Sequence, residues 1–255
     1  MTGLTVEHLT VRYGGAVAVN DLSLDAPGGV LTGLIGPNGA GKTTTFNACS
    51  GLLRPSEGRI LLFGSDVTHV APPARARLGL GRSFQRMELF DSLSVGQNVR
   101  LGREAAIAGR NPLNQLFSNP HQRQIIAAAV DEAIGLCGLG DLAGRRAGSL
   151  STGQRRLVEL ARALAGNFRF LLLDEPSSGL DRKETEGFGR ILRRVIEQRG
   201  TGILLVEHDM DLVMKVCDHI YVLDFGQMLF EGDPDAVRRS DVVRAAYLGS
   251  EAAVV

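Results

Sequence analysis

The sequence predicts an α/β fold: a phosphate-loop core on a mostly parallel sheet, an N-terminal antiparallel β layer and an inserted helical subdomain. Three observations predict it. Apolar runs that suit buried strands alternate with amphipathic runs that suit helices over most of the chain. Two alternating runs meet at a Gly-Gly turn near the N-terminus, and a glycine-rich stretch at residues 36–44 lies between an apolar run and a helical one. In such folds ligands bind at the carboxyl ends of the strands.

Length and composition limit the possible classes. With 255 residues, of which 44% are hydrophobic and 22% charged, the chain is typical of a globular protein, and we expect residues 1–255 to form a single domain. The 28 basic and 28 acidic residues balance, which weakens a nucleic-acid-binding interpretation because phosphate contacts favour a basic excess. The three cysteines lie far apart, without a histidine at metal-ligand spacing, so we expect buried thiols. We expect no signal peptide and no bilayer-spanning run, so other subunits would supply any membrane part.

The N-terminal run at residues 4–13 alternates between apolar and polar residues, which indicates a strand. Gly14-Gly15 supplies a turn, and residues 16–24 provide the returning strand of a hairpin. A hairpin placed before a phosphate loop indicates a small β layer beside the α/β core. Tyr13 ends the first strand, where its ring could stack on a flat ligand or simply pack against the protein.

Residues 36–44 fit the phosphate-loop pattern G-x-x-x-x-G-K-[ST]. Glycines let successive backbone N–H groups point into one concavity, and the helix expected from Lys42 adds its positive end. Lys42 can reach the terminal phosphates, and the Thr43 hydroxyl is placed to ligate Mg²⁺. A chance glycine turn is the alternative, but the Lys-Thr ending and the flanking strand at residues 30–35 argue against it. The residues expected to bind the nucleotide are Gly36, Pro37, Asn38, Gly39, Ala40, Gly41, Lys42, Thr43 and Thr44.

In the middle of the chain, the alternation of strand and helix patterns gives way to helical patterns. Apolar residues recur at helical spacing within residues 122–136, and Ser151 is a natural N-cap for a second periodic run. We therefore take residues 94–165 as the approximate bounds of the inserted helical subdomain. In the short helix expected at residues 72–78, before this subdomain, we expect Arg75 and Arg77 to point outward. That helix spans residues 72–78, after a turn at 51–58 and a strand at 59–64 and before a strand at 80–85 that ends at Gln85.

The C-terminal half supplies the other strands of the core. Residues 168–174 are mostly apolar up to two carboxylates, which is typical of a strand buried on both faces of a parallel sheet. Asp174 ends this strand, where a carboxylate is costly unless it serves a cation such as Mg²⁺. Glu175 could polarise water as a general base, although the pair could also simply begin a loop. His208 ends another strand and could donate to a γ-phosphate, although such histidines are more often structural. The other expected elements are a helix at 183–198, strands at 202–209, 219–224 and 227–231, a helix at 210–217 and a helical tail at 235–255.

Taken in order, these motifs resemble those of the ATP-binding subunits of ABC transporters over essentially the whole chain. The most diagnostic is Leu150-Ser151-Thr152-Gly153-Gln154, which resembles the family's signature with Thr152 in place of the first Gly. The D-loop at residues 178–181 carries Gly179 where Ala is common. The resemblance assigns Tyr13 to adenine stacking, residues 36–44 to Walker A, Gln85 to the Q-loop and to Mg²⁺, Asp174 to Walker B, Glu175 to the catalytic carboxylate and His208 to the switch histidine.

This resemblance implies that the chain binds ATP and Mg²⁺ and works as half of a head-to-tail pair with a second ABC ATPase subunit, either identical or different. Ser151, Gly153 and Gln154 of one subunit would close over the γ-phosphate held by Lys42 of the other. Hydrolysis would open the pair and drive integral-membrane permease subunits that dock near residues 85–90. The subunit would lie at the cytoplasmic face of the membrane as a peripheral protein and serve a solute-binding protein indirectly. No nucleic-acid partner is expected.

A finer resemblance is to the ATPases of branched-chain (hydrophobic) amino-acid importers. It rests on residues 110–124, 145–148, 176–180, 206–210 and 241–249. ATPases for urea or other small solutes, and for lipid or lipopolysaccharide export, remain alternatives. A soluble ABC ATPase that acts on DNA or ribosomes is the alternative of another class, but the chain has one cassette and no sustained heptads.

Overall fold

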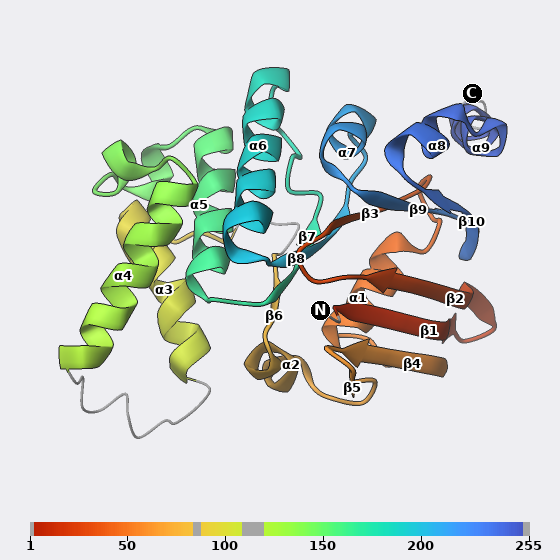
Figure 1. Cartoon of the computed structure of the whole chain (residues 1–255), viewed down its shortest axis with the longest axis horizontal. Helices are drawn as coiled ribbons and strands as arrows, with labels where there is room; N and C mark the ends of the chain where they lie inside the picture. The colour runs from red at the N-terminus through yellow and green to blue at the C-terminus, as the bar shows by residue number, and fades with distance from the viewer. Residues whose placement is uncertain (1–2, 84–87, 109–119, 252–255) are drawn as a thin grey trace.

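The computed structural model describes residues 3–83, 88–108 and 120–251, and over these residues it contains a four-stranded and a six-stranded sheet. Figure 1 shows the antiparallel layer below the central sheet. The helices α3, α4 and α5 form a group to one side of this sheet. No helix within the described ranges is long and apolar enough to cross a membrane.

The antiparallel layer contains the predicted N-terminal hairpin. β1 (Leu4–Tyr13) and β2 (Ala16–Ala26) pair up to Tyr13 opposite Ala16, so the turn is Gly14-Gly15 as expected. β4 (Glu57–Leu62) and β5 (Ser65–Asp66) extend the layer in the order β2-β1-β4-β5.

The central sheet is parallel except at one edge. Its order is β10-β9-β3-β8-β7-β6, and β10 alone among these strands runs antiparallel to its neighbour. β3, β7 and β8 are buried at every residue, as their apolar runs predict. The strands are β3 (Leu31–Ile35), β6 (Leu80–Arg82), β7 (Phe170–Asp174), β8 (Gly202–Val206), β9 (His219–Asp224) and β10 (Gln227–Gly232).

Two hydrophobic clusters cover the two faces of this sheet. Alternate side chains of β7 belong to different clusters. Leu171 and Leu173 pack with the helices, whereas Phe170 and Leu172 pack with the antiparallel layer. The cysteines are buried in these clusters, as expected, and burial raises the pKa of Cys49 and of Cys137 to about 12.

The helices follow the predicted order with shifts of a few residues at their ends. The predicted C-terminal tail is helical but consists of two helices that are separated at Ser240. The strand expected at 80–85 ends at Arg82, and Gln85 lies outside the described residues. The helices are α1 (Lys42–Ser50), α2 (Pro72–Leu78), α3 (Val95–Ala108), α4 (Pro120–Leu136), α5 (Thr152–Ala165), α6 (Arg182–Arg199), α7 (Met210–Val216), α8 (Pro234–Arg239) and α9 (Asp241–Glu251).

The prediction that Arg75 points outward is wrong, because its side chain is fully buried. The guanidinium donates to Ala48 O at 2.8 Å and to Cys49 O at 2.7 Å, at the C-terminal end of α1, and also to Thr68 O and Val70 O. The last carbonyls of a helix lack intrahelical partners and carry partial negative charge, so a cation suits them. Burial lowers the pKa of Arg75. Arg75 thus caps the helix that begins at the phosphate loop.

Arg75→Met is expected to lower the free energy of unfolding by about 2–4 kcal/mol, because the carbonyl acceptors lose their donors inside the protein. Urea unfolding of the whole chain measures this loss. Arg54→Met, at an exposed position after α1, is the control, with an expected change within about 0.5 kcal/mol. Equal losses in the two variants would contradict the capping role.

Candidate functional site

The loop at residues 36–44 joins β3 to α1 at the carboxyl end of the central sheet. Gly36, Gly39 and Gly41 have φ values of 150°, 82° and 95°, which residues with a side chain rarely adopt. A Cβ at Gly36 would also lie 2.2 Å from Leu223 O. α1 begins at Lys42 without a side-chain cap, so its first N–H groups are available to an anion.

Lys42 folds back over this loop. Its Nζ donates to Gly36 O at 2.6 Å and to Pro37 O at 2.9 Å, and the residue is 5% exposed. Burial lowers the pKa of Lys42, while the nearby carboxylates of Glu175 and Asp174 raise it. The loop therefore holds a buried cation at the place where the sequence predicts terminal phosphates.

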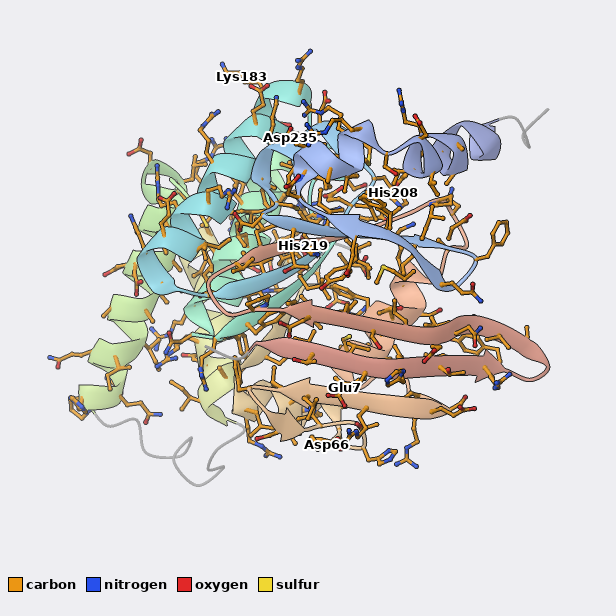
Figure 2. The ribbon with its side chains drawn as sticks, turned by 45° about the vertical axis from the view of Figure 1, so that its right-hand side comes forward. Glu7, Asp66, Lys183, His208, His219 and Asp235 are labelled. Carbon is orange, nitrogen blue, oxygen red and sulfur yellow. The ribbon has the colours of Figure 1, made fainter. Side chains whose placement is uncertain are left out.

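A hollow of about 200 Å³ brings together the phosphate loop, the predicted general base Glu175 and His208. It is lined by Ala18, residues 38–44, Glu175 and His208. A larger groove of about 790 Å³ lies between α6 and α7, but it contains no part of the phosphate loop. The smaller hollow is the candidate site because it collects the loop amides, the lysine and the two groups suited to proton transfer. Figure 2 shows His208 near the central sheet, away from Glu7 and Asp66 of the antiparallel layer.

The two carboxylates at the end of β7 face different partners. Asp174 is 3% exposed, and its Oδ2 lies 3.7 Å from Nη2 of Arg82. Burial raises the pKa of Asp174, which Arg82 partly opposes. Glu175 has φ 46°, a strained value for this residue, and its Oε1 lies 2.8 Å from Nε2 of His208. The turn at Glu175 is held by its N–H, which donates to Val206 O at 2.8 Å.

The donor set fits a hard cation. Asp174 is a buried carboxylate whose ion pair with Arg82 is long, and Thr43 is exposed at the start of α1. Mg²⁺ prefers oxygen ligands and is typically held by one or two protein groups together with phosphates. Asp174 and Thr43 are therefore the described residues that could hold it, and the third predicted ligand, Gln85, lies outside the described ranges.

Glu207 is a site residue that sequence reasoning missed. It is 3% exposed and accepts from Ser177 N at 2.8 Å and from His208 N at 3.1 Å. Burial raises the pKa of Glu207, and both hydrogen bonds oppose the rise. Glu207 thereby fixes the segment after β7 against the histidine after β8. Its signal in the sequence is the one used for Asp174, a carboxylate directly after an apolar run.

The stretch at residues 150–154 begins α5, with Ser151 as the predicted N-cap. Ser151 Oγ accepts from Gln154 N at 3.2 Å, and the Gln154 side chain accepts from Ser151 N at 3.1 Å, which is a capping box. A Cβ at Gly153 would lie 2.3 Å from Oε1 of Glu184, so a glycine suits this position. The described residues that line the hollow around Lys42 do not include Ser151, Gly153, Gln154 or Tyr13, whose side chain is 52% exposed.

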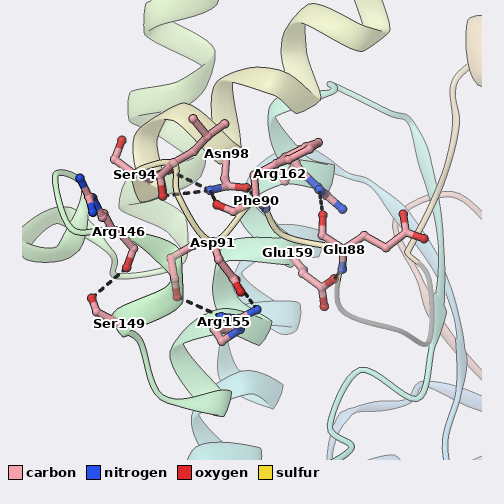
Figure 3. A network of polar contacts seen from close by, with 12 residues as sticks. Glu88, Phe90, Asp91, Ser94, Asn98, Arg146, Ser149, Arg155, Glu159 and Arg162 are labelled. Carbon is pink, nitrogen blue, oxygen red and sulfur yellow. Dashed lines mark hydrogen bonds and ion pairs between the residues drawn. The ribbon is translucent and has the colours of Figure 1, made fainter.

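The same helix α5 also holds the segment that follows Gln85. Figure 3 shows this network: Arg162 Nη1 donates to Glu88 O at 2.6 Å, and Glu88 N donates to Glu159 Oε1 at 3.0 Å. Arg155 pairs with Asp91 at 2.7 Å. Next to the segment is a second hollow of about 430 Å³, where Phe90 is 56% exposed. The N-terminus of α5 and residues 88–91 are therefore parts of one connected unit.

Comparisons with known proteins agree with this geometry. A family model described as ABC transporter matches residues 19–178, and one described as branched-chain amino acid ATP-binding cassette transporter matches residues 227–253.

Two relatives illustrate the range of functions. The chain is 37% identical over 249 residues to the high-affinity branched-chain amino acid transport ATP-binding protein BraF of Pseudomonas aeruginosa, covering 96% of this chain and 97% of that protein. It is also 37% identical over 248 residues to the lipopolysaccharide export system ATP-binding protein LptB of Acidithiobacillus ferridurans, covering 97% of each.

Solved structures share the fold. An ATP-binding cassette of an ABC transporter in its ADP conformation matches with a TM-score of 0.85 at 30% identity, over 98% of this chain and 99% of that chain. A bacterial ABC transporter cassette solved as a dimer matches with a TM-score of 0.75 at 25% identity, over 91% of this chain and 98% of that chain. The predicted fold class is confirmed by these matches.

Asp174→Asn is expected to change how stability depends on pH. The raised pKa of the folded state means that ionising Asp174 disfavours folding, so the stability from this group is present below its ordinary pKa of 3.8 and is lost as pH rises through the higher folded pKa. Asparagine removes this loss. Urea unfolding without nucleotide is therefore expected to favour the variant, relative to the unmodified chain, more at about pH 7.5 than at about pH 4, close to the ordinary pKa.

Asp131→Asn, at an exposed position of α4, is the control and is expected to give the same difference at both pH values. A difference for Asp174→Asn that is constant with pH, or larger at the lower pH, would show that this carboxyl does not carry the cost of burial.

Proposed function

The chain belongs to the ABC transporter family of ATP-binding proteins, and we propose that it is the ATP-hydrolysing subunit of an importer for branched-chain amino acids. As a member of this family it is a nucleotide-binding ATPase. The observation that carries the importer proposal is the match of residues 227–253 to the branched-chain model, because these residues lie beyond the stretch matched by the general family model. The likeness to BraF supports it.

The nucleotide is proposed to be ATP, with its phosphates on the loop. The amides of residues 38–44 and the ammonium of Lys42 would bind the phosphates, and Tyr13 would stack on the adenine. Thr43, Asp174 and Gln85 would hold Mg²⁺, which neutralises charge on the phosphates when bound.

Glu175 is proposed to accept a proton from the attacking water. Its hydrogen bond with His208 holds the carboxylate at the edge of the hollow, and Glu207 fixes the backbone of His208 in turn. The strained backbone at Glu175 supports this role, since such strain persists where surrounding contacts fix a reactive group.

A second ABC ATPase subunit, identical or different, is proposed to complete the site. Ser151, Gly153 and Gln154 lie outside the hollow of their own chain, which supports contact with the nucleotide of a partner. The N-terminus of α5 would bring its positive end to the γ-phosphate there.

Permease subunits are proposed to dock near residues 85–90, beside the hollow that includes Phe90. This arrangement would place the chain at the cytoplasmic face of the membrane as a peripheral subunit, and a solute-binding protein would act on it indirectly. The bonds of Arg162 and Glu159 to Glu88 would pass movement of the docked segment to α5. Lipopolysaccharide export is the second candidate, because LptB is as similar in sequence as BraF.

Glu175→Gln is expected to retain ATP binding and to lower the rate of phosphate release by at least about 100-fold, because it removes the proton acceptor. The variant should also accumulate as an ATP-dependent dimer in size-exclusion chromatography. Adding Ser151→Arg in the same chain should abolish that dimer without preventing ATP binding. Undiminished hydrolysis by Glu175→Gln would exclude Glu175 as the base, and a dimer that persists with Ser151→Arg would exclude the shared site.

The transported solute can be tested in the cells that make the protein. Deleting the gene is expected to abolish uptake of radiolabelled leucine, and the unmodified chain, but not Glu175→Gln, should restore it. Affinity purification from membranes should recover permease subunits. Normal leucine uptake together with defective lipopolysaccharide export would favour the second candidate instead.

A further inference from the structure

Arg156 is a buried cation in the first half of α5, where the residue is 7% exposed. Its Nη1 lies 3.1 Å from Oε2 of Glu159, whose side chain is also nearly buried, one turn further along the helix. Removing two charges from water is costly, so each ion of a buried pair needs further hydrogen-bonding partners. Those partners are backbone groups of two segments outside α5, one for each ion.

The guanidinium of Arg156 reaches the turn that follows β7. Its Nε donates to Ser178 O at 3.4 Å. Ser178 N in turn donates to Glu175 O at 3.1 Å, so the residue that Arg156 holds is bonded to the backbone of the proposed base. Arg156 and Pro176 also line one small cavity of about 10 Å³, which places the guanidinium beside the start of this turn.

The turn at residues 176–180 lies between α5 and the segment after β8. Toward β8, Ser177 N donates to Oε1 of the buried Glu207 at 2.8 Å. Toward α5, the turn comes so near that a Cβ at Gly179 would lie 3.4 Å from Cγ2 of Thr152. Glu207 thus holds the turn from the β8 side, and Arg156 holds it from the α5 side.

Glu159 connects the same ion pair to the surface segment at residues 88–91. Its Oε1 accepts from Glu88 N at 3.0 Å, while its Oε2 pairs with Arg156 (Figure 3 shows Glu88 and Glu159). Burial raises the pKa of Glu159, and the N–H of Glu88 and the charge of Arg156 oppose the rise. One carboxylate therefore joins the surface segment to the guanidinium that holds the turn.

We propose that Arg156 is a positioning residue for ATP hydrolysis, which fixes the turn after Glu175 against α5 and so sets the direction of the Glu175 carboxylate. The inference rests on the proposed function, because Glu175 is the proposed proton acceptor. The strained φ of 46° at Glu175 requires contacts that hold the residues after it, and Arg156 supplies one of them. Through Glu159, a displacement of residues 88–91 reaches this turn within the same subunit.

Arg156→Lys tests this role because it keeps a positive charge beside Glu159 and replaces the Nε–H donor with a methylene group. Arg199→Lys is the matched control: Arg199 is also mostly buried, pairs with Glu132 at 2.8 Å and donates to Leu164 O at 2.8 Å. Because the turn shifts while the phosphate loop is untouched, Arg156→Lys is expected to lower kcat about 5- to 10-fold with KM for ATP within about 2-fold. Arg199→Lys is expected to change neither, and equal losses in the two variants would overturn the inference.

Combining the substitution with Glu175→Gln supplies a readout that a merely structural role would not give. Since Arg156 acts through Glu175, Arg156→Lys is expected to cause no further loss of single-turnover hydrolysis once that carboxylate is absent. The same fold-loss in both backgrounds, or full kcat in Arg156→Lys alone, would overturn the inference and leave the proposed function intact. Undiminished hydrolysis by Glu175→Gln alone would exclude Glu175 as the base and remove the inference with it.

Discussion

The cost of burying charge at the carboxyl ends of β7 and β8 governs how the rest of the site is arranged. An unpaired ion in a protein interior is unfavourable, so each buried charge needs ionic or hydrogen-bonding neighbours. Asp174 lies beside Arg82, Glu207 accepts from two backbone N–H groups, and Lys42 rests on loop carbonyls. Arg82 and Ser177 come from segments distant in the sequence, and the packing of the sheet brings them to these carboxylates, whereas Lys42 uses carbonyls of its own loop. The site consequently has its charges in place before any ligand binds.

Local patterns suffice to predict most of the fold. β3, β7 and β8 are continuous apolar runs, and a loop that curls around an anion needs glycines at fixed positions, so both leave a signal within a few residues. Boundaries are less well predicted: the strand expected at 202–209 ends at Val206, because Glu207 already serves neighbouring segments. The burial of Arg75 could not be predicted from local patterns, because helical periodicity contains no information about its carbonyl partners on α1.

The candidate site is predictable because its residues lie in the segments that follow strands. Lys42 ends the glycine-rich loop after β3, Glu175 and His208 follow β7 and β8 within two residues, and all three lie around one hollow. Glu207 offers the same signal and is overlooked because its partners are backbone groups rather than a ligand.

The anchoring of residues 88–91 along α5 has a mechanical consequence. Arg162 and Glu159 bind Glu88, and Arg155 binds Asp91, closer to the end of the helix that Ser151 caps. At 1.5 Å per residue, these contacts extend over about 10 Å of the helix axis. Contacts at separated points along an axis resist tilting as well as sliding. Residues 88–91 and α5 therefore form one stiff body, in which the capped end keeps its place relative to the surface segment.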